Sequence, residues 1–148
     1  MKTIYRIITA LVIATLILVA CAPAEPESSQ SEPESGLGLA NPASVNCEKK
    51  GGTVVIQKRG DGGEYGVCVF ADNRQCEEWA MYRGDCPEGG IDTTDYVTAA
   101  ALYCAISGGE YAVTDKSGLE DEQGTCSFKT GKTCDAWEFY NGTCDANQ

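Results

Sequence analysis

One cysteine-bounded pattern occurs twice in the chain, as CEEWAMYRGDC at Cys76–Cys86 and as CDAWEFYNGTC at Cys134–Cys144. Cys, Trp, Tyr, Gly and Cys keep the same spacing in both copies. This internal repeat predicts two small modules, which we place at residues 41–87 and 95–145. A module of this length buries too little surface to be stable by itself, so disulfides, metals or association usually add the missing stability.

The cysteine and histidine contents limit the chemistry of the chain. It has nine cysteines and no histidine. Histidine is the commonest zinc ligand and the usual general base, so we expect no metal, no cofactor and no catalytic residue. The cysteines closest in sequence, Cys68 with Cys76 and Cys126 with Cys134, are too far apart for a Cys-x-x-Cys redox pair. With no nucleophile motif either, the sequence predicts that the protein is not an enzyme.

Residues 1–20 have the features of an export signal. Lys2 and Arg6 form a short basic region, and the apolar run at 7–20 is too short to span a membrane comfortably. The run ends in LVAC at 18–21, which resembles the lipobox of bacterial lipoproteins. The resemblance implies that Cys21 is lipidated and anchors the protein to the cell membrane or outer envelope, facing outside the cytoplasm.

Residues 21–40 continue from this cysteine as a tether rich in Pro, Glu and Ser. Such a composition cannot fill a core, so we expect a solvated segment. The net charge of the chain is −11, and it becomes −13 without the two basic residues of the leader. A charge of this sign makes nucleic acid and anionic lipid surfaces unsuitable partners.

The sequence of the first module predicts a helix, then a β-hairpin, then a second helix. Asn41 and Pro42 suit the start of a helix that stops at the glycines 51–52. The segments 53–58 and 65–70 are β-rich and flank a turn at 59–63. The Trp motif predicts a helix over about 75–83 that ends at Gly84.

The second module repeats this order with a helix at 97–107, strands at 110–114 and 125–128, and a last helix capped by Thr133. Residues 87–93, PEGGIDT, are expected to be a hinge. The fold class is therefore α+β, with two small disulfide-stapled modules. We expect each module to fold by itself when oxidised.

Comparison of the two copies predicts which strand face is buried. Cys and Phe recur at alternate positions, whereas Val67 and Val69 become Thr125 and Ser127. The face with Cys and Phe is therefore the buried one. The two valines form an apolar strip that is either covered by the second module or left as a contact surface.

The hairpin tip carries Arg59-Gly60-Asp61, the tripeptide that integrins bind. Gly and Asp are also what such a turn requires, so the turn explains the tripeptide without adhesion. Arg59 and Asp61 nevertheless join Val67 and Val69 as the candidate contact surface. Acidic residues at 61–64 and 120–122 lack EF-hand spacing, which favours a solvated surface over a calcium site.

The two tryptophans have two interpretations. Trp79 and Trp137, with a tyrosine three residues on, are suited to stacking on carbohydrate or on a partner. We favour the simpler interpretation, in which each Trp is the main core residue of its module.

Three segments of the first module, ANPASVNCEKKGG, GVCVF and CEEWAMYRGDC, resemble a small domain of unknown function. That domain occurs in bacterial and archaeal lipoproteins that are often named hemolysins. The resemblance covers 40–87 strongly and 96–144 more weakly, and it implies no catalytic or ligand residues. Lysis of membranes is at odds with the strong negative charge and the lack of a long apolar segment after the signal.

Export places the remaining eight cysteines in an oxidising compartment, where an even number predicts disulfides. They are Cys47, Cys68, Cys76 and Cys86 in the first module and Cys104, Cys126, Cys134 and Cys144 in the second. Three pairings are open in each module. The resemblance favours Cys47 with Cys68 and Cys76 with Cys86. The alternative joins Cys47 to Cys86 and Cys68 to Cys76.

These inferences predict a membrane-anchored envelope lipoprotein that acts as a non-catalytic binding or inhibitory module. The partners would be the membrane, through the lipid anchor, and an extracytoplasmic protein or wall polymer. The alternative is a purely structural envelope lipoprotein, and a hemolysin-like protein is the weaker third choice.

Overall fold

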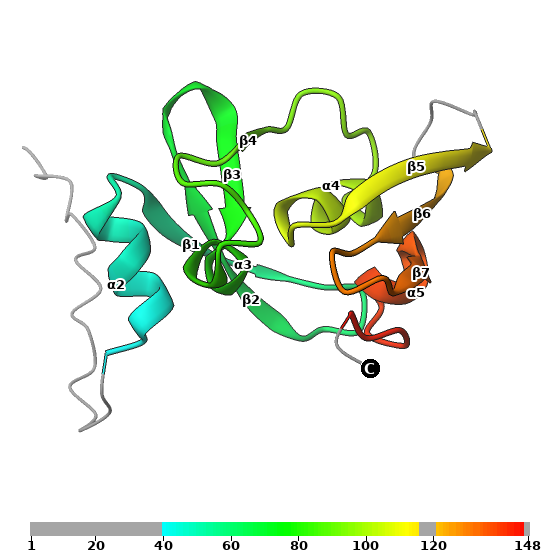
Figure 1. The fold of residues 1–148 in the computed structure, drawn as a ribbon, viewed down its shortest axis with the longest axis horizontal. Coiled ribbons are helices and arrows are strands. Elements are labelled where there is room, and N and C mark those ends of the chain that lie inside the picture. Colours follow the sequence, from blue (N-terminus) through cyan, green and yellow to red (C-terminus); the bar gives the residue numbers. More distant parts are fainter. Residues whose placement is uncertain (1–39, 116–120, 147–148) are drawn as a thin grey trace, which may run out of the picture. The chain divides into compact units, whose positions relative to one another are not determined.

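The structure is a computed structural model that describes residues 40–115 and 121–146 (Figure 1). The predicted signal, Cys21 and the tether lie outside the described residues, as does Glu120. None of the helices in the described ranges is both long and apolar enough to cross a membrane.

Module 1 begins with a helix and continues as an antiparallel sheet with strand order β1-β2-β3-β4. Asn41 caps the first helix by accepting a hydrogen bond from Ala43 N at 3.0 Å, and Pro42 occupies its first turn. The elements are α2 (Pro42–Lys49), β1 (Thr53–Lys58), β2 (Glu64–Val69), a 3-10 turn (Ala71–Asn73), β3 (Arg74–Glu77), α3 (Glu78–Arg83) and β4 (Ile91–Asp92).

The Trp motif starts as a strand, so the prediction of a helix from residue 75 is wrong. Asp72 and Asn73 both have φ of 59° and turn the chain back onto β2. Cys76 then lies opposite Cys68 in the ladder. The helix begins only after Glu77, whose backbone is extended. Pairing with a strand that is not adjacent in sequence therefore decides the structure of 74–77.

The expected hinge at 87–93 is also wrong, because part of it is β4. Gln75 pairs with Ile91, and Thr93 Oγ1 donates to Asn73 O at 2.9 Å. Gly90 has φ of 75°, and a Cβ there would lie 2.7 Å from Gln75 N. The segment that joins the modules is thus tied to the first sheet.

Module 2 has the same plan with a three-stranded sheet of order β5-β6-β7. Thr98 caps its first helix through Ala101 N at 3.0 Å. Asp135, not the predicted Thr133, caps the last helix, because Thr133 belongs to a strand. The elements are α4 (Ala99–Ile106), β5 (Glu110–Asp115), β6 (Gln123–Ser127), β7 (Thr133–Asp135) and α5 (Ala136–Tyr140).

Each module holds two disulfides, and no bridge joins the modules within the described residues. One pair ties the first helix to the second strand, and the other joins the third strand to the segment that follows the last helix. The Cα separations of 5.7 and 6.0 Å are ordinary for disulfides. The pairs are Cys47–Cys68, Cys76–Cys86, Cys104–Cys126 and Cys134–Cys144, which is the pairing that the family resemblance implied.

The two modules share a core, so they are not independent in this structure. Val67 of β2 is 0% exposed and lies in one cluster with Ile106 and Phe139 of module 2. The rings of Tyr65 and Tyr103 meet edge to face with centroids 4.8 Å apart. Residues 38–148 accordingly form one compact unit. Module 2 covers the apolar strip of Val67 and Val69, so the alternative, in which the strip is an open contact surface, is wrong.

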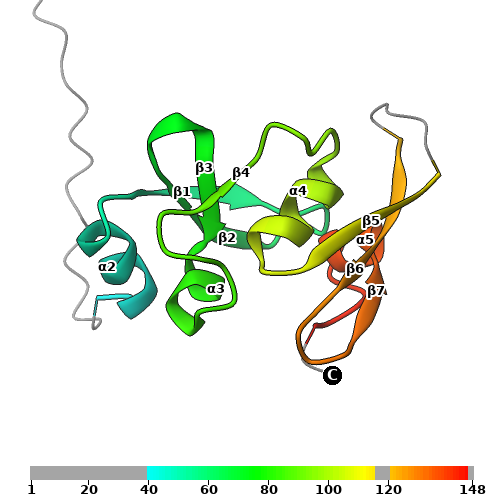
Figure 2. The same ribbon diagram turned by 45° about the horizontal axis from the view of Figure 1, so that its top comes forward.

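The tip of the β1–β2 hairpin lies beside α5 in both views (Figures 1 and 2). Gly60 N donates to Tyr140 O at 3.3 Å, and the Tyr140 hydroxyl donates to Lys58 O at 3.2 Å. A Cβ at Gly60 would overlap the end of the Asn141 side chain, so a larger residue here would displace that side chain. The hairpin of module 1 is thereby held against the last helix of module 2.

Candidate functional site

A groove of about 330 Å³ lies where the β1–β2 hairpin meets the start of α3. Its lining includes the apolar residues Ile56 and Trp79, the glycine Gly66 and the acidic residues Glu64 and Glu78. We call it the Trp79 groove. It is also lined by Arg59, Tyr65, Glu77 and Tyr103.

The aromatic side chains beside this groove are exposed, contrary to the prediction that Trp79 fills the core. Trp79 is 39% exposed, Tyr82 is 51% exposed, and their rings meet edge to face with centroids 5.7 Å apart. Ile56 on β1 is 60% exposed. A helix that began at residue 75 would place Cys76 and Trp79 on one face. Because Cys76 lies on strand β3 and not on the helix, this spacing does not identify the buried face of α3. Met81 takes the core position instead.

The equivalent tryptophan of module 2 is held differently. Trp137 is half-buried, and its Nε1 donates to Glu122 O at 3.1 Å. Phe139, which matches Met81, fills the core there. Tyr140 contacts Tyr103 and the hairpin of module 1. An exposed Trp–Tyr pair is therefore a property of module 1.

Glu78 places a buried carboxylate at the wall of the groove. It is 4% exposed and accepts hydrogen bonds from Asn41 Nδ2 at 2.8 Å and Ser44 Oγ at 2.6 Å. The carboxylate lies so close to Gly66 that a Cβ on that glycine would overlap it. Module 2 replaces all three polar residues, with Thr98, Ala101 and Ala136 at the matched positions.

This coordinated replacement is the signal by which the sequence could have identified the site. The change from Glu78 to Ala136, taken alone, only makes the second copy of the repeat less similar to the first. The pair of changes on the first helix that accompanies it indicates a polar network present in one module alone. Ile56 is the other groove residue that the sequence did not indicate. It has no such signal, because Val113 at the matched position is also apolar.

Glu77 caps α3 from inside the molecule. Its carboxylate accepts from Trp79 N at 3.1 Å and from Ala80 N at 2.6 Å. Burial raises the pKa of the Glu77 carboxyl, and the two backbone N–H groups oppose that effect. Within the described part of the chain, neither Glu77 nor Glu78 forms an ion pair.

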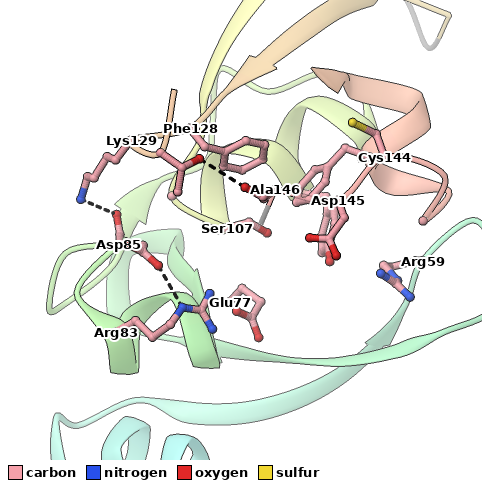
Figure 3. Close-up of a pocket in the computed structure, with 15 residues that line it drawn as sticks. Arg59, Glu77, Arg83, Asp85, Ser107, Phe128, Lys129, Cys144, Asp145 and Ala146 are labelled. Atoms are coloured by element: carbon pink, nitrogen blue, oxygen red, sulfur yellow. Dashed lines mark hydrogen bonds and ion pairs between the residues drawn. The ribbon is translucent and has the colours of Figure 1, made fainter. Parts of the chain in front are cut away.

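A second cavity of about 290 Å³ lies at the seam between the modules (Figure 3). Arg83 and Lys129 both point toward Asp85. Arg83 Nε lies 3.0 Å from Asp85 Oδ2, and Lys129 Nζ donates to the carbonyls of Gly84 and Asp85 at 3.3 and 3.2 Å. These cations are engaged by the protein itself, so the cavity is explained as a polar seam.

The predicted contact surface is not assembled in the structure. Val67 is buried and Val69 is partly buried against module 2. Arg59 pairs with Asp61 at 2.9 Å, and Asp61 also accepts from Gly63 N at 2.8 Å within its own turn. Val67 and Val69 are therefore not available as a contact surface, because β2 packs onto the second module, and a contact role of Arg59 and Asp61 stays a prediction.

The described cysteines are all in disulfides. Among residues 40–115 and 121–146, no three His, Cys, Asp or Glu side chains gather closely enough to hold a metal ion. The chemistry that the groove offers is that of aromatic, aliphatic and carboxylate groups.

Comparison with known proteins identifies the family of the chain. The model of the family described as Domain of unknown function (DUF333) matches residues 38–85 and 97–143. The chain is 35% identical over 85 residues to Uncharacterized protein YoaF of Escherichia coli strain K12 and to the proteins of that name from Escherichia coli O6:H1 and Shigella flexneri. Each alignment covers 57% of this chain and 96% of the relative. No solved structure matches the chain.

Neither the family description nor the names of these relatives mentions hemolysis. The two matched segments overlap the two modules that the cysteine pattern predicts, although each match ends one residue before the last cysteine of its module. The chain therefore belongs to the DUF333 family and carries two tandem copies of its domain.

Proposed function

We propose that the protein is a lipid-anchored envelope protein whose paired DUF333 domains act as a non-catalytic binding module outside the cytoplasm. The observation that carries the binding function is the exposed cluster of Ile56, Trp79 and Tyr82 beside the Trp79 groove. Clustered apolar side chains on a surface mark interaction sites, and Trp and Tyr contribute most of the energy at such sites.

Two further features support the location. The LVAC sequence at 18–21 has the form of a lipobox, and the polar stretch after it would hold the modules away from the membrane. Four disulfides in a unit this small are typical of proteins that fold in an oxidising compartment. Lipidation at Cys21 would give the two or more acyl chains that stable anchoring requires.

One experiment with tagged full-length protein in a bacterial host tests both parts. Wild type should incorporate radioactive palmitate, remain in the membrane fraction and capture a component of the envelope after mild crosslinking. Cys21→Ala should lose the label. Trp79→Ala should keep the label and lose the captured component, because it removes only the exposed ring.

Val97→Ala is the matched control, since Val97 is exposed and apolar but lies away from the groove. It should retain both the label and the captured component. Absence of label on wild type would contradict the anchor. Equal capture by wild type, Trp79→Ala and Val97→Ala would contradict binding at the Trp79 groove, and no specific capture by any of them would favour a purely structural envelope protein.

A further inference from the structure

Strand β1 is the least protected sheet edge in the described part of the chain. The other edges there are β4 with two residues, β7 with three, and β5 with a register shift between Val113 and Asp115. Short strands and bulges are the usual protection against pairing with another chain. β1 pairs regularly with β2 over six residues and exposes Val55 and Ile56.

The outer backbone groups of β1 accept or donate few hydrogen bonds within the described residues. In an antiparallel ladder, alternate residues direct their N–H and C=O groups away from the partner strand. Among the described residues, no strand pairs with that outer side. The far end is occupied, because Lys58 O accepts from the Tyr140 hydroxyl. Residues 53–57 therefore form an open template for one more strand.

The Trp79 groove lies next to this edge and defines the chemistry of the added strand. Ile56 belongs both to β1 and to the groove wall. The carboxylates of Glu77 and Glu78 have no ion-pair partner in the described residues, and the one cation of the groove, Arg59, pairs with Asp61. An entering Lys or Arg would meet the carboxylate of Glu78, whose hydrogen-bond partners are the neutral side chains of Asn41 and Ser44, and the exposed ring of Trp79, which attracts cations.

We propose that β1 and the Trp79 groove bind an extended basic segment of a partner protein by strand addition. The backbone of the segment pairs with residues 53–57, and one of its Lys or Arg side chains enters the groove between Ile56 and Trp79. The net charge of −11 on the chain attracts such a segment and disfavours a second copy of the chain as the occupant. This inference rests on the proposed binding function and names its site and partner class.

Module 2 provides an internal control because its edge strand and its tryptophan lack the features that would allow an added strand to bind. Its edge strand carries the bulge, Ala136 replaces Glu78, and Trp137 Nε1 is tied to Glu122 O. The proposal therefore assigns the site to module 1 alone.

The test uses the mature chain with Cys21→Ala, which leaves all described residues intact, and three synthetic peptides of about eight residues. The first alternates Lys with Val or Thr, the second replaces Lys by Glu, and the third keeps the Lys residues but places Pro at alternate positions. Calorimetry should detect binding of the first peptide only. The Pro peptide has the same charge but cannot complete a ladder.

Ile56→Lys should weaken binding of the Lys peptide by about tenfold or more, since it places a like charge on the edge and in the groove. Glu78→Gln should weaken binding while leaving the strand edge unchanged. Val113→Lys, the matched change on β5, should leave the affinity within about twofold. Far-ultraviolet circular dichroism and the urea midpoint of each variant show whether it is folded.

Equal binding of the Lys and Pro peptides would overturn strand addition, and equal effects of Ile56→Lys and Val113→Lys would overturn the site. Self-association through β1, detected by light scattering and lost in Ile56→Lys, would also overturn the proposal. If no peptide binds but Trp79-dependent capture from the envelope persists, this inference fails and the proposed function stands. If the capture is absent as well, both fail.

Discussion

At the scale of single residues, Glu78 shows how one repeat can be specialised. Its buried carboxylate is balanced by the side chains of Asn41 and Ser44, not by a cation. A buried charge is tolerated only when hydrogen bonds satisfy it, so the three residues depend on each other. Module 2 lacks all three together, which is the expected result when such a network is lost as a unit.

This dependence predicts a non-additive mutant series. Glu78→Ala should lower the free energy of unfolding by about 1 to 3 kcal/mol, because Asn41 and Ser44 keep partly buried donors without an acceptor. The triple variant Asn41→Thr, Ser44→Ala and Glu78→Ala, which installs the residues of module 2, should be more stable than Glu78→Ala alone. Urea denaturation of the oxidised mature chain measures both. A triple variant less stable than the single one would contradict a coupled network.

At the scale of helices and strands, the sequence correctly predicted those elements whose structure depends on residues close together in the chain. The helix cap at Asn41 and the strand at 53–58 are confirmed because capping and β-rich composition are encoded within a few residues. Strand β3 was missed because Arg74–Glu77 pairs with β2, and its own composition does not favour a strand. The exposure of Trp79 follows from that shift, so the groove could not be predicted either. β4 was missed because glycines 89 and 90 suggest a flexible connection.

The status of β4 can be tested by comparing two adjacent glycines. Gly89 and Gly90 have φ of 83° and 75°, but a Cβ on Gly89 meets nothing within 4 Å, whereas one on Gly90 lies 2.7 Å from the backbone of β3. Gly89→Ala should cost about 1 kcal/mol through its backbone conformation alone. Gly90→Ala should cost clearly more, because β4 must also move away from β3. Thermal unfolding with equal losses for the two variants would indicate that 87–93 is a hinge after all.

At the scale of the whole molecule, the two repeats form a closed pair. Module 1 offers Val67 and Val69 to module 2, but the matched Thr125 and Ser127 of module 2 are polar. The receiving helix α4 contributes Tyr103 and Ile106, whereas α2 has Asn46 and Lys49 at the matched positions. The apolar contacts between the repeats are thus made by β2 of module 1 and α4 of module 2, while the matched faces on the other side of each module are polar.

The central claim is that the two modules unfold as one body through the shared core around Val67. The chain has one tryptophan per module, so Trp137→Phe leaves Trp79 to report on module 1, and Trp79→Phe leaves Trp137 to report on module 2. Urea unfolding of the oxidised chain should give coincident transitions for the two reporters. Val67→Ala should shift both midpoints equally, by about 1 to 3 kcal/mol in unfolding free energy.

Val55→Ala, the cross-strand neighbour of Val67 with an exposed side chain, is the matched control and should shift neither midpoint appreciably. The decisive measurement is the Trp137 fluorescence transition in the Val67→Ala protein. A downward shift equal to that of Trp79 is the predicted result. An unchanged Trp137 transition beside a lowered Trp79 transition would show that the modules unfold separately and would contradict the account.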